Sequence, residues 1–363
     1  MGPDKLTTRQ AILWFTMHQI GTAFLVLPRH LYAIAKQDAW IALTVGLGIQ
    51  LLVILIYMAI ANQINGKSMV QHMKLLFGSP FGNSLLLLFI LGVPLLLQFI
   101  ALRDLGDFVN NSITPETPME FICFLMLIPI YYAVRTGIGT IGRTAEFFFI
   151  FFIALFVIVI ITLAPSIQID NLLPVLEEGW KPVFHASLIY ISFPYMDNIL
   201  FLFLIPYYTE PQKLKKIFLT STLISGIMFI LMIAAVAAVL SESVAAHLTY
   251  PSYFVVRTIS IIDFIERFEI LVTIFWYITV FYRLALLLFV TNHVLVEMFK
   301  LRVEYALLIP LLLLTFAGMT LVWPNTAAQI NVAKNWYIYG LSYGLIFPFI
   351  LWCMGKLRAL PRS

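Results

Sequence analysis

The sequence predicts an all-α polytopic membrane protein with ten transmembrane helices. Composition is the first reason: 61% of the 363 residues are hydrophobic and only 11% are charged, whereas soluble domains carry roughly 25% charged residues. The second reason is that long apolar runs, each sufficient for a span of ~20 residues, alternate with short polar breaks. The third is that two runs, in matching places of the two halves, are interrupted at their centres.

The apolar runs divide into five in each half of the chain. The ten predicted spans are residues 11–34, 39–61, 84–103, 119–134, 144–164, 183–208, 214–240, 266–298, 303–322 and 335–356. Because the loops are short, we expect one membrane domain over residues 1–363, with repeats at 1–165 and 183–356 and no soluble enzyme domain.

The first and sixth spans are the interrupted ones. The first carries Gly21-Thr22-Ala23 at its centre, and the sixth carries the run Ser192 to Asp197, which includes Pro194. Inside a bilayer, backbone groups freed by such a break must be satisfied by protein or within a cavity. A corresponding pair of Gly- or Pro-broken helices is the best sequence pointer to a transporter-type binding site. The breaks therefore predict where a ligand lies.

The helix ends at these breaks also indicate a ligand chemistry. A half-helix that begins after Gly21-Thr22-Ala23 directs N–H groups and a partial positive charge into the cavity, which suits a carboxylate. Unwound carbonyls and helix C-termini suit an ammonium group or a cation. Together these ends describe a site for a zwitterion, and an amino acid is the simplest candidate.

Two charged residues fall deep in the spans. Arg283 lies midway along the eighth span and cannot be neutralised at any usable pH. It either anchors a ligand carboxylate or forms a structural pair with Asp197 of the sixth-span break. Asp197 in turn accepts a ligand amino group, carries a coupling proton or neutralises Arg283. The candidate ligand-binding residues are Gly21, Thr22, Ala23, Ser192, Tyr195, Asp197, Tyr282 and Arg283.

Three further polar residues are accessory candidates. His18, one turn before Gly21, either bonds a ligand or forms an interhelical hydrogen bond, and Gln98 in the third span has the same two interpretations. Thr279, together with carbonyls near the first break, is a candidate ligand for a coupling sodium ion. The sequence leaves these alternatives open.

Several functional classes lack support. The chain has no nucleophile–base pair, phosphate-binding loop or metal-ligand spacing, and Cys123 and Cys353 fall inside the fourth and tenth spans. No basic stripe with interleaved aromatic residues indicates nucleic-acid binding, and no charged ring indicates a channel. We therefore expect no enzyme activity, no cofactor, no metal site and no nucleic-acid partner.

Lysine and arginine counts predict the orientation in the bilayer. With the N-terminus inside, the cytoplasmic set is Lys5, Arg9, Lys67, Lys74, Arg135, Arg143, Lys213, Lys215, Lys216, Lys300, Arg302, Lys356, Arg358 and Arg362. The opposite set is half that size: Arg29, Lys36, Arg103, Lys181, Arg257, Arg267 and Lys334. Both termini are therefore predicted to be cytoplasmic. The longest external connections are 167–182 and 241–265, and the second is interpreted as either a lid over the cavity mouth or an interfacial helix.

Three motifs of the chain are distinctive. They are Gly21-Thr22-Ala23-Phe24-Leu25-Val26-Leu27-Pro28-Arg29, Asp170-Asn171-Leu172-Leu173-Pro174-Val175-Leu176-Glu177-Glu178-Gly179 and Phe264-Ile265-Glu266-Arg267-Phe268-Glu269. In these motifs the chain resembles the bacterial spore germination permease family, the B-type subunits of nutrient germinant receptors. The resemblance covers the whole chain. It departs from the family at Ala23, where a second glycine is usual, and at Tyr195, where a glycine is usual.

The resemblance implies a LeuT-like 5+5 inverted repeat, membership of the amino acid–polyamine–organocation superfamily, and residence in the spore inner membrane. It also implies a germinant that is typically an amino acid such as L-alanine, and partnership with A-type and C-type receptor subunits. Two function hypotheses follow. The first is a germinant-binding subunit that signals to its partners without net transport, and the second is an ion-coupled amino acid transporter.

Overall fold

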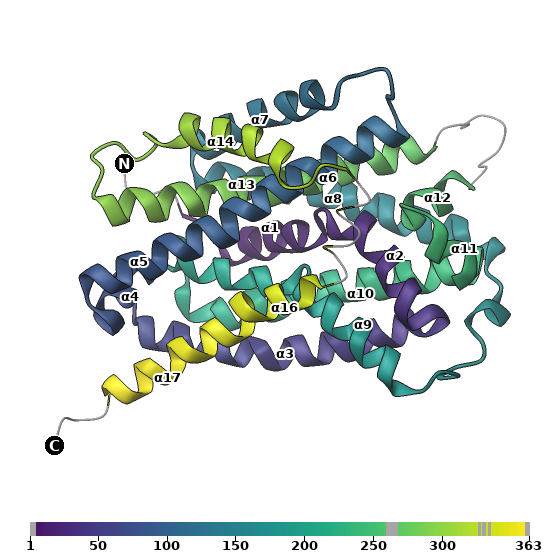
Figure 1. Ribbon diagram of the computed structural model, residues 1–363, viewed down its shortest axis with the longest axis horizontal. Coiled ribbons are helices and arrows are strands. Elements are labelled where there is room, and N and C mark those ends of the chain that lie inside the picture. Colours follow the sequence, from purple (N-terminus) through teal and green to yellow (C-terminus); the bar gives the residue numbers. More distant parts are fainter. Residues whose placement is uncertain (1–4, 259–267, 326–327, 329–331, 333–334, 360–363) are drawn as a thin grey trace.

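The protein is described by a computed structural model covering residues 5–258, 268–325, 328, 332 and 335–359. Helices make up the ordered structure of these residues, which contain no β-strand but one isolated bridge between Leu6 and Tyr208. Many of the long helices lie side by side, as Figure 1 shows. Helix α1 (Thr8–Ile20) contacts three of them, which are α8 (Ile138–Leu163), α10 (Leu214–Leu240) and α13 (Phe268–Phe299). This architecture confirms the all-α prediction.

Eight stretches of the described chain are long and apolar enough to cross a membrane. They are Ala23–Ile64, Ser79–Ser112, Met119–Thr136, Ile138–Ser166, Trp180–Tyr207, Pro211–Leu240, Glu269–Phe299 and Trp336–Arg358. These stretches confirm a multi-pass membrane protein. The ninth predicted span contains a shorter apolar helix, Leu308–Leu321, and the first two predicted spans are joined through a 3₁₀ turn at Lys36–Asp38. The ten-span, 5+5 arrangement stays a prediction.

The helices named next form most of these stretches and the connections between them. Their bounds are α3 (Ala39–Ile64), α4 (Met69–Phe77), α5 (Ser79–Ile90), η2 (Leu91–Leu95), α6 (Leu96–Ser112), α7 (Met119–Thr136), α8 (Ile138–Leu163), α10 (Leu214–Leu240), α13 (Phe268–Phe299), α14 (Leu308–Leu321), α16 (Trp336–Leu341), η7 (Ser342–Ile346) and α17 (Phe347–Ala359).

The first apolar run is divided into α1 and α2 (Ala23–Ala35). Helix α1 begins with a capping box, in which Thr7 and Gln10 bond each other's backbone N–H groups. It ends at Gly21, which has φ +23° and ψ −130°. A positive φ is readily available only to glycine, so this residue permits the interruption that the sequence predicts.

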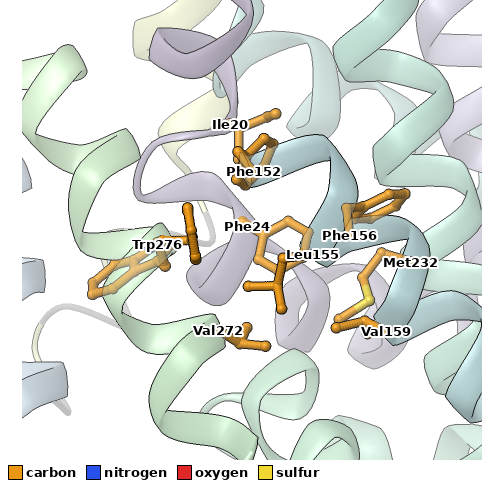
Figure 2. A pocket seen from close by; sticks show the side chains of 10 residues that line it. Ile20, Phe24, Phe152, Leu155, Phe156, Val159, Met232, Val272 and Trp276 are labelled. Atoms are coloured by element: carbon orange, nitrogen blue, oxygen red, sulfur yellow. The ribbon is translucent and has the colours of Figure 1, made fainter. Parts of the chain in front are cut away.

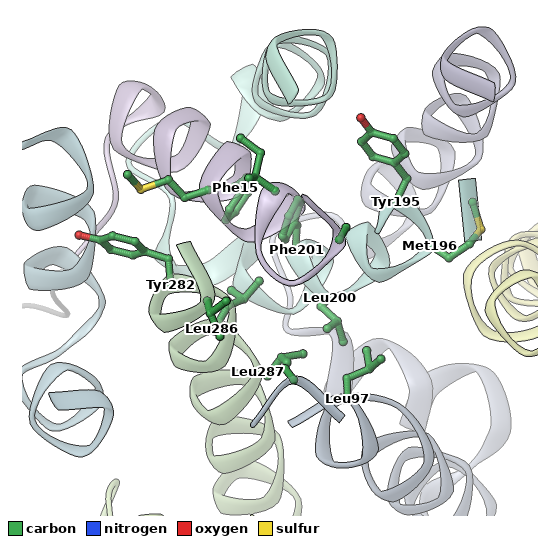
Figure 3. Packing of buried hydrophobic residues seen from close by; sticks show 14 of the residues in the cluster. Phe15, Leu97, Tyr195, Met196, Leu200, Phe201, Tyr282, Leu286 and Leu287 are labelled. Atoms are coloured by element: carbon green, nitrogen blue, oxygen red, sulfur yellow. The ribbon is translucent and has the colours of Figure 1, made fainter. Parts of the chain in front are cut away.

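The sixth predicted span is divided as well. Helix α9 (Trp180–Ser192) is followed after Phe193 and Pro194 by the 3₁₀ helix η5 (Tyr195–Tyr207). Thirteen residues is long for a 3₁₀ helix, since runs beyond 3–4 residues are uncommon. Side chains of η5 lie inside the hydrophobic core, as Figure 3 shows, and the Phe201 ring stacks on Phe15 of α1 with centroids 3.6 Å apart. The two interrupted segments therefore pack against each other.

The N-terminal segment is tied to the end of η5. Leu6 donates its N–H to the carbonyl of Tyr207 at 2.8 Å, and Thr209 donates to the carbonyl of Leu6 at 2.9 Å. Leu6 itself is fully buried. These two bonds hold the start of the chain beside the junction between η5 and α10.

The predicted external connections pack on the ends of α2 and α3. Both carboxylate oxygens of Asp38 accept from the N–H of Leu176, at 3.0 and 3.1 Å, and Lys36 pairs with Glu178. The segment 241–265 contains α11 (Glu242–His247) and α12 (Pro251–Arg257), and both contact α2. Residues 259–265 lie outside the described part, as does most of the third family motif, and the lid stays a prediction.

Candidate functional site

An ion pair lies at the meeting point of the two breaks. Arg283 of α13 donates through Nη2 to Asp197 of η5 at 2.5 Å, and the two side chains are 1% and 0% exposed. Tyr343 of η7 donates its hydroxyl to the other carboxylate oxygen of Asp197. On the α1 side, Nη1 of Arg283 lies 3.5 Å from the carbonyl of His18. One guanidinium therefore connects α13 to both interrupted segments.

Both charged side chains of this pair are buried, so the pair must offset the cost of removing two charges from water. Taking two charges out of water costs several kcal/mol per ion, and mutual attraction offsets the cost only with good geometry. The guanidinium has further support from Phe193, whose ring centroid lies 5.1 Å from Cζ, within the range of a cation–π contact. Its Nε atom has no hydrogen-bond partner among the described residues. A carboxylate-bearing ligand would find a donor already held in place.

Glycine at position 21 is what lets Arg283 approach the break. A Cβ atom there would lie 2.7 Å from Cδ of Arg283 and 2.9 Å from the carbonyl oxygen of His18, both closer than real contacts. The backbone carbonyl freed at the break is also bonded, because Trp276 donates its indole N–H to the carbonyl of Gly21 at 2.8 Å. Two side chains of α13, Arg283 and Trp276, therefore lie against the unwound turn.

A hydrogen-bonded network lies beside the pair and joins α1, α9, η5 and α10. Ser225 donates to Gln19 at 2.7 Å and lies 3.1 Å from the hydroxyl of Tyr195. Gln19 donates to Asn198 at 2.9 Å, and the Tyr195 hydroxyl lies 2.9 Å from that of Tyr190. All of these side chains are fully buried. Because their polar groups satisfy one another, the network orients the two interrupted segments.

The structure brings together some of the predicted site residues. Arg283 bonds Asp197 and lies next to Gly21 at the break, with Thr22 and Ala23 directly following Gly21. The hydroxyl of Thr22 is buried and has no hydrogen-bond partner among the described residues.

The other predicted ligand-binding residues make contacts elsewhere. Ser192 donates its hydroxyl to the Ile189 carbonyl at 2.7 Å. Gly340 packs closely against it, because a Cβ atom on Gly340 would lie only 2.6 Å from the Cβ of Ser192. Tyr195 belongs to the network. The ring of Tyr282 points away from Leu286 and Leu287 in Figure 3, and its carbonyl accepts from Trp14 at 3.0 Å.

The accessory candidates also have structural contacts. Gln98 bonds Thr291 at 2.9 Å and accepts from Thr315 at 3.2 Å, which clamps α6, α13 and α14 together. Thr279 donates within its own helix to Trp276 at 2.6 Å. The ring of His18 packs edge-on against Phe201, with centroids 5.5 Å apart.

Sequence reasoning missed three residues that touch the pair or the break, which are Tyr343, Phe193 and Trp276. It also missed Asn198, which accepts from Gln19 in the adjoining network. It also missed Asp104, because the third span was ended at Arg103. Helix α6 continues to Ser112, and Asp104 is 3% exposed within it. The signal that could have placed Asp104 inside the span was the continuation of the helical pattern of apolar residues past Arg103.

Two hollows adjoin the interrupted segments. The first, of about 20 Å³, lies between α1, α2, α8, α10 and α13 and is lined only by apolar side chains and Trp276 (Figure 2). The second, of about 60 Å³, lies between α2, α6 and α9 and includes Phe193, His30 and Asp104. Only the second offers charged groups and a wall shared with Arg283. Within the described residues, no group of three or more His, Cys, Asp and Glu side chains is arranged to hold a metal ion.

These features define a multi-pass helical membrane protein with a polar site between interrupted helices. The family model described as "Spore germination protein" matches residues 5–327. The chain therefore belongs to the spore germination protein family, which confirms the resemblance seen in its motifs.

Three relatives from Bacillus subtilis (strain 168) illustrate the similarity. Spore germination protein KB is 25% identical over 357 residues, covering 97% of this chain and 94% of the relative. Spore germination protein A2 is 26% identical over 369 residues, covering 98% and 97%. Spore germination protein B2 is 23% identical over 281 residues, covering 75% and 74%. The first two similarities extend over nearly the full length of both chains.

Proposed function

We propose that this protein is the germinant-binding B-type subunit of a nutrient receptor, which recognises a small molecule at the break site and signals to partner subunits. Family membership supports the germination role. The observation that carries the binding site is the buried guanidinium of Arg283, held at the break between Asp197 and the carbonyl of His18. An amino acid is the proposed ligand class, because its carboxylate would pair with Arg283.

The proposal includes a signalling step. A ligand carboxylate that takes the place of Asp197 on Arg283 leaves Asp197 bonded to Tyr343, so the contact between α13 and η5 changes. Such a ligand shifts the protein toward the state in which it makes better contacts. We place the receptor in the spore inner membrane with both termini on the core side. In this proposal ten spans form two five-helix repeats, and A-type and C-type subunits are the partners.

The experiment is a thermal-shift screen of the purified full-length protein against amino acids, sugars and nucleosides. A ligand at a hundredfold excess over its Kd stabilises the folded state by about 2.7 kcal/mol, which gives a measurable rise in Tm. We expect amino acids to be the active class and Arg283→Lys to abolish the rise, because lysine cannot reproduce the planar fork. Full response of Arg283→Lys to the same ligand would refute the site.

Ion-coupled amino acid transport is the second candidate. It is favoured by one observation: the buried hydroxyl of Thr22 has no partner among the described residues and lies at the break, where neutral oxygens suit a cation. Uptake of the identified ligand into proteoliposomes, with dissipation of an imposed ion gradient, would favour transport. Ligand binding without uptake would favour the receptor.

A further inference from the structure

A larger hollow lies at the predicted external end of the two interrupted segments. Its volume of about 570 Å³ falls within the range of small-molecule sites, ≈ 300–1,000 Å³. The half-helices that join the two breaks to this side, α2 and α9, both line it, and α11 and the start of α16 complete its lining. We call it the outer hollow and define it by Arg29, Ala33, His185, Ala246, Asn335 and Tyr337.

The polar groups that line the outer hollow favour an anion. Arg29 brings a permanent positive charge and takes part in none of the ion pairs recorded among the described residues. The imidazole of His185, the amide of Asn335 and the hydroxyl of Tyr337 add hydrogen-bond donors. The described residues that line this hollow include no acidic side chain. The lining therefore suits a carboxylate, which accepts hydrogen bonds from all of these groups.

Contacts between helices hold the polar groups in place. The ring of His185 packs edge-on against that of Tyr337, with centroids 5.4 Å apart, so α9 and α16 present these two groups together. Arg29 is half-buried on α2, and a charge that is partly withdrawn from water is screened less than an exposed one. Ala33, one turn further along α2, is small and exposed, which leaves room for a ligand beside Arg29.

A narrow hollow separates this space from the ion pair. His30 and Ile189 line both the outer hollow and the hollow of about 60 Å³ between α2, α6 and α9. A water molecule needs about 10–15 Å³ of such space, so the narrow hollow has room for a few waters and is too small for an amino acid. Phe193 lines the narrow hollow, and its ring centroid lies 5.1 Å from Cζ of Arg283. A molecule in the outer hollow is therefore held apart from Arg283.

We propose that the outer hollow is a second binding site, which takes the carboxylate of a small organic molecule before that molecule reaches the break. The order of the two steps rests on the function proposed above. Arg29 pairs with the carboxylate, and His185, Asn335 and Tyr337 donate to it or to other polar atoms of the molecule. Because a cleft of one charge concentrates ions of the opposite charge, the site also raises the rate at which carboxylates enter.

The first test measures the charge of the outer hollow with thiol reagents. The full-length protein carries Cys123→Ala, Cys353→Ala and Ala33→Cys, and is placed in nanodiscs of phosphatidylcholine. Its reaction with anionic 2-sulfonatoethyl methanethiosulfonate is compared with that of the cationic trimethylammonium counterpart. Arg29→Gln should lower the ratio of the anionic to the cationic rate by about threefold or more. Arg257→Gln, which removes an exposed arginine of α12 on the same predicted side, should leave the ratio unchanged.

The second test reads binding from protection of the same cysteine against neutral methyl methanethiosulfonate. L-leucine and 4-methylpentanoate carry a carboxylate and should slow the reaction in a saturable way, whereas leucinamide lacks the carboxylate and should not. Arg29→Gln should abolish the protection, and Arg29→Lys should keep part of it because the positive charge remains. Ser166→Cys, at an exposed residue just after α8, is the control cysteine and should show no protection.

Equal protection by leucine and leucinamide, or protection that survives Arg29→Gln, would overturn the inference. Protection by phosphatidylglycerol in the nanodisc, with none from the soluble carboxylates, would also overturn it, because the bound anion would then be a lipid headgroup. The absence of any protection would do the same.

The break site is judged separately, from the rise in Tm that a ligand causes in the Arg29→Gln variant. Adding Arg283→Lys to that variant should abolish the rise. If protection of the cysteine is absent but Arg283→Lys still abolishes the rise, only the outer site fails. If the protection is present but Arg283→Lys leaves the rise unchanged, only the break site fails.

Discussion

Two ion pairs in this protein have opposite surroundings. Lys36 and Glu178 pair at the predicted external surface with side chains 51% and 46% exposed. Arg283 and Asp197 pair at the break with side chains 1% and 0% exposed. Exposed pairs are screened by water and salt, and their median contribution is ≈ 0–1 kcal/mol. A buried pair costs desolvation, so it is weak support for stability but cannot lose one partner without a large penalty.

This difference in burial indicates that the two ion pairs have different roles. The exposed pair, Lys36 and Glu178, holds the connection between α8 and α9 in place. Asp38 already holds the same connection by accepting from the N–H of Leu176. The inner pair is the only charge contact recorded among the described residues that joins α13 to η5, and apolar residues of similar volume would serve packing as well or better. The ligand recognition that we propose for Arg283 would account for the presence of charge at that place. Four predictions examine this contrast, beginning with the largest effect.

Removing Arg283 alone should have the largest effect on stability. Arg283→Met leaves Asp197 buried and unpaired, which we expect to cost about 3–5 kcal/mol. The double variant Arg283→Met with Asp197→Leu should regain most of that loss, because no isolated charge remains. The measurement is the thermal midpoint in detergent, with the exposed Arg302→Met as control. Equal midpoints for the single and double variants would contradict the desolvation argument.

Adding one carbon at the break should have the next largest effect. Gly21→Ala introduces a Cβ at 2.7 Å from Cδ of Arg283 and places a side chain at φ +23°. Strain and overpacking together should cost roughly 2–4 kcal/mol. Gly48→Ala in α3 is the matched control, since nothing lies within 4 Å of its added Cβ. We expect Gly48→Ala to leave the stability unchanged or to raise it slightly. If Gly21→Ala also leaves the stability unchanged, the structure around the break can relax to accept the added carbon.

Trp276→Phe removes the indole N–H that bonds the Gly21 carbonyl and keeps most of the ring. The buried carbonyl then lacks its donor, and the expected loss is about 1–3 kcal/mol. Trp180→Phe, at a residue 51% exposed, should change the midpoint far less. If both substitutions have the same effect, the hydrogen bond to the break contributes nothing.

The outer pair should give the smallest effect. Lys36→Gln should leave the thermal midpoint at neutral pH within experimental error, because water and salt screen this half-exposed pair. Pairing with Glu178 raises the pKa of Lys36 above its ordinary value. Its contribution is therefore present below that ordinary value and is lost as the pH rises through the raised one. If Lys36→Gln lowers the thermal midpoint at neutral pH and moderate salt, the two ion pairs differ less in their contribution to stability than their burial indicates.

Much of the architecture was predictable, because membrane insertion imposes a simple pattern on the sequence. Most of the apolar runs correspond to helices at nearly the predicted bounds. The break at Gly21 was visible because glycine in an apolar run disrupts a helix. The Arg283–Asp197 pair was also predictable as one of two alternatives, since charges deep in spans are costly and seek partners.

Other features depend on contacts that one sequence does not reveal. Asp104 was missed because its charge suggested a loop, whereas the surrounding helices bury it. Tyr195 was expected at the ligand site, but its hydroxyl bonds Ser225 and Tyr190 from neighbouring helices. Gln98 was weighed as a ligand contact, and Thr291 and Thr315 satisfy its amide. Of these partners, Ser225, Thr291 and Thr315 are all distant in sequence from the residue that they bond.

The bridge at Leu6 gives the N-terminus a mechanical connection to the site. Asp197 lies near the start of η5, and Tyr207, at its other end, is bonded to Leu6. If displacement of its first turn changes the length of η5, then Tyr207 moves. Leu6 must then move with it, or the bonds that Leu6 forms with Tyr207 and Thr209 must break. Leu6 is therefore bonded to the end of η5 opposite the turn that carries Asp197. A spectroscopic label on Lys5 would report movement at the break from the outside of the molecule.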